Sequence, residues 1–375
     1  MGFLDPLDEN SMKQRDELLD FVRGLSAVLV LVAHVRAFFF KDFGELSDPG
    51  VIEKAFYFLT SLHHQAVMVF FVLSGYFVGG TMCAQIRRGQ FSLKRYAAAR
   101  LTRLWTVLVP ALFLTAICDG IGRAMAPAAY NGLWRTAFMS GPTPEVPADL
   151  SAPTLFGNLF FLQTVVLPVY GTNGPLWSLA NEFWYYVLFP LGALVMVHFR
   201  GAPVKALGLT ILLCGLLAWL PNALLFHGGI WLLGVAVWWF RPLQSVRLRL
   251  AICLFASSAF LITLALSKTN SVWGSDLAVG LGFAGWLWVF KELPLRGIAF
   301  RRIAIWLSDI SFTLYVTHFP LLFLVAAVGC GGIQWASGPV AYAAFFGISA
   351  SLLVAAWLLW FAFESRTETV RKWIK

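Results

Sequence analysis

Long apolar stretches recur along this whole chain, and they constrain its fold more than any single motif does. A helix needs roughly 20 mainly apolar residues to cross the hydrocarbon core of a bilayer. Polar breaks divide the sequence into ten stretches near that length, so we predict an all-α polytopic membrane protein with about ten transmembrane helices in one domain, residues 1–375. The expected spans are 18–40, 56–82, 101–118, 176–198, 204–220, 223–240, 249–267, 273–290, 307–329 and 339–363.

The distribution of basic residues predicts the orientation of these spans. Only 13% of the residues are charged, whereas about a quarter would be in a soluble domain. The predicted loops on one side hold 22 of the 28 Lys and Arg residues, which marks that side as cytoplasmic. Both termini are therefore predicted to be cytoplasmic. The net charge of +9 does not indicate nucleic-acid binding, because the basic residues are spread between apolar stretches; the expected partner is a lipid bilayer.

One connection is much longer than the others. Residues 119–175 are rich in Pro and Gly but also in aromatic residues, and the predicted topology places them outside the cytoplasm. Long ordered loops usually carry function, so we expect a lid or a platform for an acceptor. Within this loop, the apolar segment 154–168 is short and interrupted by polar residues. It is predicted to be re-entrant or interfacial.

The cysteines indicate neither a disulfide framework nor a zinc site, and no metal site is expected. They are scattered and lack the spacing of metal ligands. The five are Cys83, Cys118, Cys214, Cys253 and Cys330.

The first predicted helix carries two residues that are costly inside a membrane, Arg23 and His34. They are 11 residues apart, so they share nearly the same face of the helix and are separated by about 16 Å along its axis. Read singly, Arg23 suits a residue that extends to the interface, and His34 suits a core histidine bonded to a carbonyl. Read together, they place a cation near the cytoplasm and an imidazole deeper in the bilayer.

Further polar groups extend this axis. Arg100 and Arg103 lie one turn apart at the start of the third span, where paired guanidinium groups can bind phosphate. Ordinary positive-inside charge explains Arg87, Arg88 and Lys94 in the preceding loop. Glu182 lies near the outer end of the fourth span, at a depth similar to that of His34. We expect phosphate binding at the cytoplasmic end and proton transfer in the outer half.

Several histidines are weaker candidates. His63 and His64 lie at the outer start of the second span and are candidates for acceptor binding or for a solvated interface pair. His318 follows Tyr315 in a late apolar span and is interpreted first as structural polarity.

Six local strings together resemble the acyltransferase-3 family of membrane acyltransferases. LLDFVRGLSAVLVLVAHVRAFF is similar to its opening helix, with ten residues between Arg23 and His34, and RYAAARLTRLW is similar to its Arg-x-x-Arg stretch. GPLWSLANEFWYYVLFP resembles its Trp-Ser-Leu-x-x-Glu element and thereby adds Trp177 and Ser178. The others are MVFFVLSGYFVGG, SDISFTLYVTHFPLL and AFESRTETVRKW. The matches follow the family's order from residue 18 to residue 373.

The resemblance implies a bacterial inner-membrane enzyme that transfers an acyl group, usually acetyl, from cytoplasmic acyl-CoA to a hydroxyl of an extracytoplasmic glycan. Acyl-CoA would be the donor substrate, and no permanently bound cofactor is expected. We predict that Arg23, Arg100 and Arg103 bind the donor, that His34 is the general base, and that Glu182 orients His34 or the acceptor. A covalent acyl-histidine stays open.

Two other classes of function also stay open. A transporter or flippase would use the arginines for an anionic substrate and would use His34 and Glu182 as a proton relay. A structural subunit of a polysaccharide-export complex would have polysaccharide-assembly proteins as partners and would not require His34.

Overall fold

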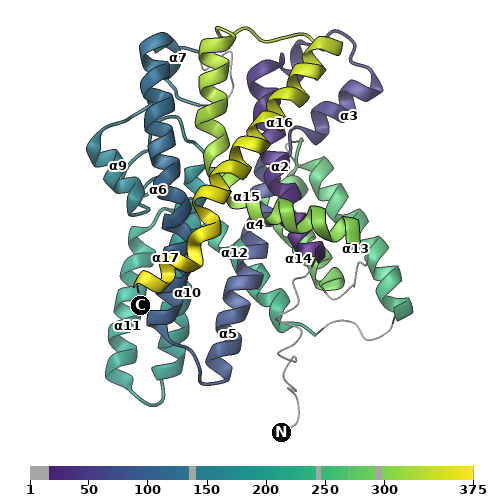
Figure 1. Cartoon of the computed structure of the whole chain (residues 1–375). Helices are drawn as coiled ribbons and strands as arrows, with labels where there is room; N and C mark the ends of the chain where they lie inside the picture. The colour runs from purple at the N-terminus through teal and green to yellow at the C-terminus, as the bar shows by residue number, and fades with distance from the viewer. Residues whose placement is uncertain (1–16, 135–140, 242–245, 270, 292–297, 375) are drawn as a thin grey trace.

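The computed structural model describes residues 17–134, 141–241, 246–269, 271–291 and 298–374 (Figure 1). Its longer helices are α2 (Glu17–Phe39), α4 (His63–Ser74), α6 (Leu93–Met125), α10 (Leu176–His198), α11 (Pro203–Trp219), α12 (Asn222–Trp239), α13 (Val246–Leu266), α14 (Asp276–Phe290), α15 (Ile298–Leu324) and α16 (Pro339–Ala362). The shorter ones are η1 (Phe43–Glu45), α3 (Val51–Leu59), η2 (Gly75–Gly79), α5 (Gly80–Arg87), α7 (Pro127–Tyr130), α9 (Ala152–Leu159), η3 (Val272–Gly274), η4 (Val325–Gly329), η5 (Glu364–Arg366) and α17 (Thr367–Ile374).

The prediction of an all-α polytopic membrane protein is confirmed. Within the described residues, seven helical segments are long and apolar enough to cross a membrane, and β-structure is limited to isolated bridges. Three shorter apolar helices, Pro203–Trp219, Ala251–Leu266 and Asp276–Phe290, occupy the other three predicted spans.

The predicted span 56–82 is wrong at its start. The structure has two helices there, α3 and α4, separated by a turn. The hydroxyls of Thr60 and Ser61 donate to the carbonyls of Phe56 and Phe58, at 2.7 and 2.8 Å. Such local side-chain bonds compete with helix propagation and end α3. The spanning segment therefore begins at His63, continues through η2 and ends with α5.

Glycines allow the central helices to approach closely. A Cβ atom added to Gly24 of α2 would lie 2.4 Å from Cβ of Leu307 on α15. At the crossing of α4 and α12, a Cβ on Gly234 would lie 1.9 Å from the carbonyl oxygen of Val72. Small residues at such crossings permit the backbone contact that holds membrane helices together.

The long connection between α6 and α10 folds inward along the helices. The indole N–H of Trp105 on α6 donates to the carbonyl of Leu159 at the end of α9, at 2.9 Å. The amide of Asn173 donates to the carbonyl of Val316 on α15, at 2.9 Å. Helix α10 thus begins beside the middle of α15. Residues 135–140 of the connection lie outside the described residues.

Candidate active site

Three histidines from different helices meet at one place. Nδ1 of His34 on α2 lies 2.9 Å from Nε2 of His318 on α15, and the ring of His63 on α4 has its centroid 5.2 Å from that of His34. His34 and His318 are both buried, with 9% and 1% of their surface exposed. His318 is therefore a neighbour of His34, a proximity that the separation of 284 residues along the chain did not indicate.

The hydrogen-bond partners assign the protons of this pair. Nδ1 of His318 lies 2.9 Å from the carbonyl oxygen of Leu314, which can only accept a hydrogen bond, so this nitrogen carries the proton. In the neutral ring, Nε2 of His318 is then an acceptor, and Nδ1 of His34 donates to it. Nε2 of His34 keeps its lone pair. This tautomer is the one that suits a general base.

His34 lines a cavity of about 350 Å³, which we call the histidine cavity. His63, His64 and Trp177 also line it, together with residues of the long connection such as Thr172. The side-chain hydroxyl and backbone N–H of Thr172 donate to the buried Asp119 of α6, at 2.9 and 2.6 Å, which fixes that wall.

Arg23, Arg100 and Arg103 line a second cavity of about 160 Å³, which we call the arginine cavity. The guanidinium group of Arg100 lies 6.0 Å from the ring centroids of both Tyr96 and Tyr186. Its Nε is buried and has no hydrogen-bond partner. A guanidinium held between aromatic rings with an unused donor can receive an anionic group.

Arg23 is held by its neighbours on α2 and α15. Its Nη2 donates to Asp20, at 3.3 Å, and to the hydroxyl of Ser308, which in turn donates to Asp20 at 2.6 Å. On the C-terminal side, the carboxylate of Glu364 accepts hydrogen bonds from the backbone N–H and the hydroxyl of Thr313 on α15, at 3.3 and 2.6 Å.

Glu182 lies in the arginine cavity, whereas His34 lies in the histidine cavity, so the expected common depth of these two residues is wrong. The carboxylate of Glu182 accepts hydrogen bonds from the hydroxyls of Ser74, at 2.7 Å, and Tyr186. The prediction assumed that α10 starts at the outer surface. In the structure, α10 starts beside Val316. Glu182 lies six residues after Leu176, the first residue of α10, which places it about 9 Å further along the helix toward the other end of the bundle.

The two cavities share part of their lining. Val67 and Tyr315 contact both, and the hydroxyl of Tyr315 lies 2.7 Å from that of Ser178, which lines the arginine cavity. The next residue back along the chain, Trp177, lines the histidine cavity. The first turn of α10 therefore borders both spaces, and Tyr315 lies at the boundary between them.

A family model described as an acyltransferase domain, that of the acyltransferase-3 family, matches residues 16–360. The chain belongs to this family. Residues 16–360 therefore carry the acyltransferase domain of this family on a multi-pass helical fold, and the family is the one that the motifs resemble.

Comparison with individual proteins adds one relative of this chain. An uncharacterized protein of Haemophilus influenzae is 27% identical over 142 residues, which is 37% of this chain. The chain spans about half the length of that relative, 52%. No solved structure matches the chain.

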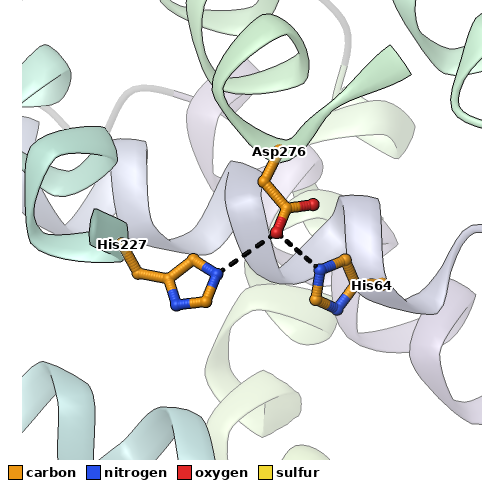
Figure 2. A group of neighbouring side chains, drawn as sticks. All are labelled: His64, His227 and Asp276. Atoms are coloured by element: carbon orange, nitrogen blue, oxygen red, sulfur yellow. Dashed lines mark hydrogen bonds and ion pairs between the residues drawn. The ribbon is translucent and has the colours of Figure 1, made fainter. Parts of the chain in front are cut away.

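The sequence did not predict one group of residues in this chain. His64, His227 and Asp276 converge from α4, α12 and α14 (Figure 2). His227 and Asp276 are not among the candidate residues that the sequence indicated. The three residues are separated by more than 40 positions along the chain, so no local spacing could have indicated the group.

Proposed function

We propose that this acyltransferase is an O-acetyltransferase of the bacterial inner membrane. It moves an acetyl group from cytoplasmic acetyl-CoA to a hydroxyl of a cell-surface polysaccharide or another extracytoplasmic glycan. The observation that carries the proposal is that the arginine cavity and the histidine cavity share two lining residues, Val67 and Tyr315.

The donor enters the arginine cavity in this proposal. Arg100 and Arg103 hold the phosphates of CoA, and Arg23 adds positive charge at the same cavity. The separation of about 16 Å between Arg23 and His34 along α2 is close to the reach of a pantetheine arm. The thioester then lies at the boundary beside Tyr315, and the acceptor enters from the histidine cavity.

The chemistry needs one base and one leaving group. Nε2 of His34 takes the proton of the acceptor hydroxyl while its oxygen attacks the thioester carbonyl, which forms the ester C–O bond. The C–S bond breaks, and the thiolate of CoA receives the proton from His34. The products are the acetylated glycan and free CoA. His318 holds His34 in the required tautomer through the 2.9 Å bond.

Glu182 acts on the donor side. Its hydrogen bond from Tyr186 fixes one of the two rings that hold Arg100, so it positions that guanidinium group. This proposal replaces the role predicted from the sequence, in which Glu182 orients His34 or the acceptor.

Donor binding is tested with purified protein in nanodiscs by titration with acetyl-CoA. Arg100→Gln is expected to weaken binding about tenfold or more, because it removes a charge-assisted contact. Arg302→Gln is the matched control, since Arg302 is exposed and lies outside the lining of the arginine cavity. Equal affinities of wild type and Arg100→Gln would contradict the donor site.

Acceptor transfer is tested by mass spectrometry of surface glycans from a deletion strain complemented with wild type, His34→Ala or His198→Ala. We expect the glycans to regain the mass of the acetyl group when the strain carries wild type or His198→Ala. At equal expression, the strain with His34→Ala should not regain it. Normal acetylation with His34→Ala would refute the assignment of the base. Substrate counterflow without a covalent product would favour a transporter instead.

A further inference from the structure

We propose that His64, His227 and Asp276 form a binding site for a divalent transition-metal ion of the zinc type, with an open position facing the histidine cavity. This inference does not depend on the proposed donor or acceptor. It concerns a separate group of residues at the ends of α4, α12 and α14 (Figure 2).

The ligand atoms converge on one place. Nε2 of His64 and Nε2 of His227 lie 2.9 and 3.2 Å from the same carboxylate oxygen, Oδ2 of Asp276. All three ligand atoms lie within 4.8 Å of one another. In a tetrahedral zinc site with bonds of about 2.0 Å, neighbouring ligand atoms are about 3.3 Å apart. Both nitrogen–oxygen distances are already close to that value.

The chemistry of the ligands suits an open site. Two imidazoles and one carboxylate form the three-ligand set of catalytic zinc centres, in which water or substrate takes the fourth position. His64 lines the histidine cavity, so this position would face that cavity. The side chains are partly exposed, 40% for His64, 26% for Asp276 and 13% for His227.

The surrounding side chains hold the rings in place. Trp177 stacks on His64 with centroids 6.0 Å apart and lies 5.4 Å from the ring of His227, while Phe71 contacts His227 from α4 at 5.8 Å. Asp276 is the first residue of α14, and the hydroxyl of Ser275 caps this helix. An apolar shell around a polar group of this kind limits the movement of its ligands.

The alternative is a hydrogen-bonded triad without an ion, in which both rings donate Nε2–H to Asp276. The buried Nδ1 of His227 has no hydrogen-bond partner, which suits a ring that carries its proton on Nε2. The experiment must therefore measure the ion itself.

The test uses full-length protein purified without a histidine tag, stripped with a chelator and then titrated with zinc. Metal content is measured by mass spectrometry after desalting. Wild type and the control His198→Gln are expected to retain about one zinc per chain, whereas His227→Gln and Asp276→Asn lose at least about tenfold in affinity. Zinc should also raise the Tm of wild type and not that of Asp276→Asn.

A second measurement does not depend on the folding of the variants. Cobalt added to wild type should give the intense visible absorption of a four-coordinate site, and zinc should displace it. Equal zinc uptake by wild type and Asp276→Asn, or the absence of a saturable cobalt spectrum in wild type, would overturn the proposal and leave the hydrogen-bonded triad.

Discussion

Nδ1 of His34 and Nε2 of His318 are 2.9 Å apart, and the bond of His318 to the carbonyl of Leu314 determines which ring donates. In the proposed mechanism, His318 therefore acts through His34 as a positioning residue. This contact joins α2 to α15 at the wall of the histidine cavity. The tautomer of His34 therefore depends on the packing of these two helices.

Replacing His318 should reduce the chemical step without weakening donor binding. In His318→Leu, Nδ1 of His34 loses its acceptor, so the reactive tautomer is no longer selected. We expect kcat to fall about 10- to 100-fold, less than the 10²- to 10⁴-fold typical of losing a general base, with the KM for acetyl-CoA unchanged. His318→Gln, whose side-chain oxygen can accept the bond, should restore part of kcat. A matching rise in KM would argue against a positioning role.

Glu182→Gln should act on the donor side. Because Glu182 lines the arginine cavity and accepts from Tyr186, the substitution should raise the KM for acetyl-CoA about three- to tenfold and change kcat less. Tyr186→Phe should have a similar effect, since it removes the same hydrogen bond. Steady-state kinetics with varied acetyl-CoA would measure both. A fall in kcat alone would instead place Glu182 in the proton transfer.

Tyr315→Phe tests the boundary between the cavities. The hydroxyl of Tyr315 is the polar group at the place where the thioester carbonyl is proposed to lie, and a donor to a developing oxyanion is typically worth about 10²- to 10³-fold in kcat. We expect kcat to fall by about 10²-fold. Ser178→Ala, which removes only the partner of that hydroxyl, should have a smaller effect. Unchanged turnover in Tyr315→Phe would exclude an oxyanion role for this residue.

Gly75→Ala should destabilise the crossing of η2 and α12. The added Cβ would lie 1.9 Å from the carbonyl oxygen of Trp231, a backbone atom that cannot rotate away. Overpacking of this kind costs about 1–3 kcal/mol, so the Tm in detergent should fall by several degrees. Gly120→Ala in α6 is the control, because its Cβ meets nothing within 4 Å and alanine favours a helix. Equal melting temperatures would show that the crossing can relax.

Lys268 should titrate at lower pH than an ordinary lysine. Desolvation of its amino group, with a further contribution from the charge of Arg36, lowers its pKa to about 8. Because this folded pKa lies below the unfolded value, the contribution of Lys268 to stability should increase as pH rises from about 8 to about 10.4. Mass spectrometry after amine labelling should give a reactivity midpoint near 8 for Lys268. A midpoint near 10 would contradict the lowered pKa.

The sequence by itself determined the class of fold and the family. Runs of about 20 apolar residues must cross a bilayer as helices, because unpaired backbone groups are too costly in hydrocarbon, and this rule needs no tertiary contact. The ordered motifs around Arg23, Glu182 and His318 identified the acyltransferase family for the same reason, since each motif is local. Helix ends were less predictable: the turn at Thr60 and Ser61 depends on side-chain bonds that interrupt an apolar run.

Only the tertiary structure decided which polar residues meet. Helical periodicity places Arg23 and His34 on one face, but it cannot set the depth of α10 against α15. That depth follows from the inward fold of the long connection and the bond of Asn173 to Val316, which puts Glu182 with the arginines. The pairing of His34 with His318 and the convergence of His64, His227 and Asp276 join residues far apart in the chain. Such contacts depend on how helices pack, and packing is a property of the whole bundle.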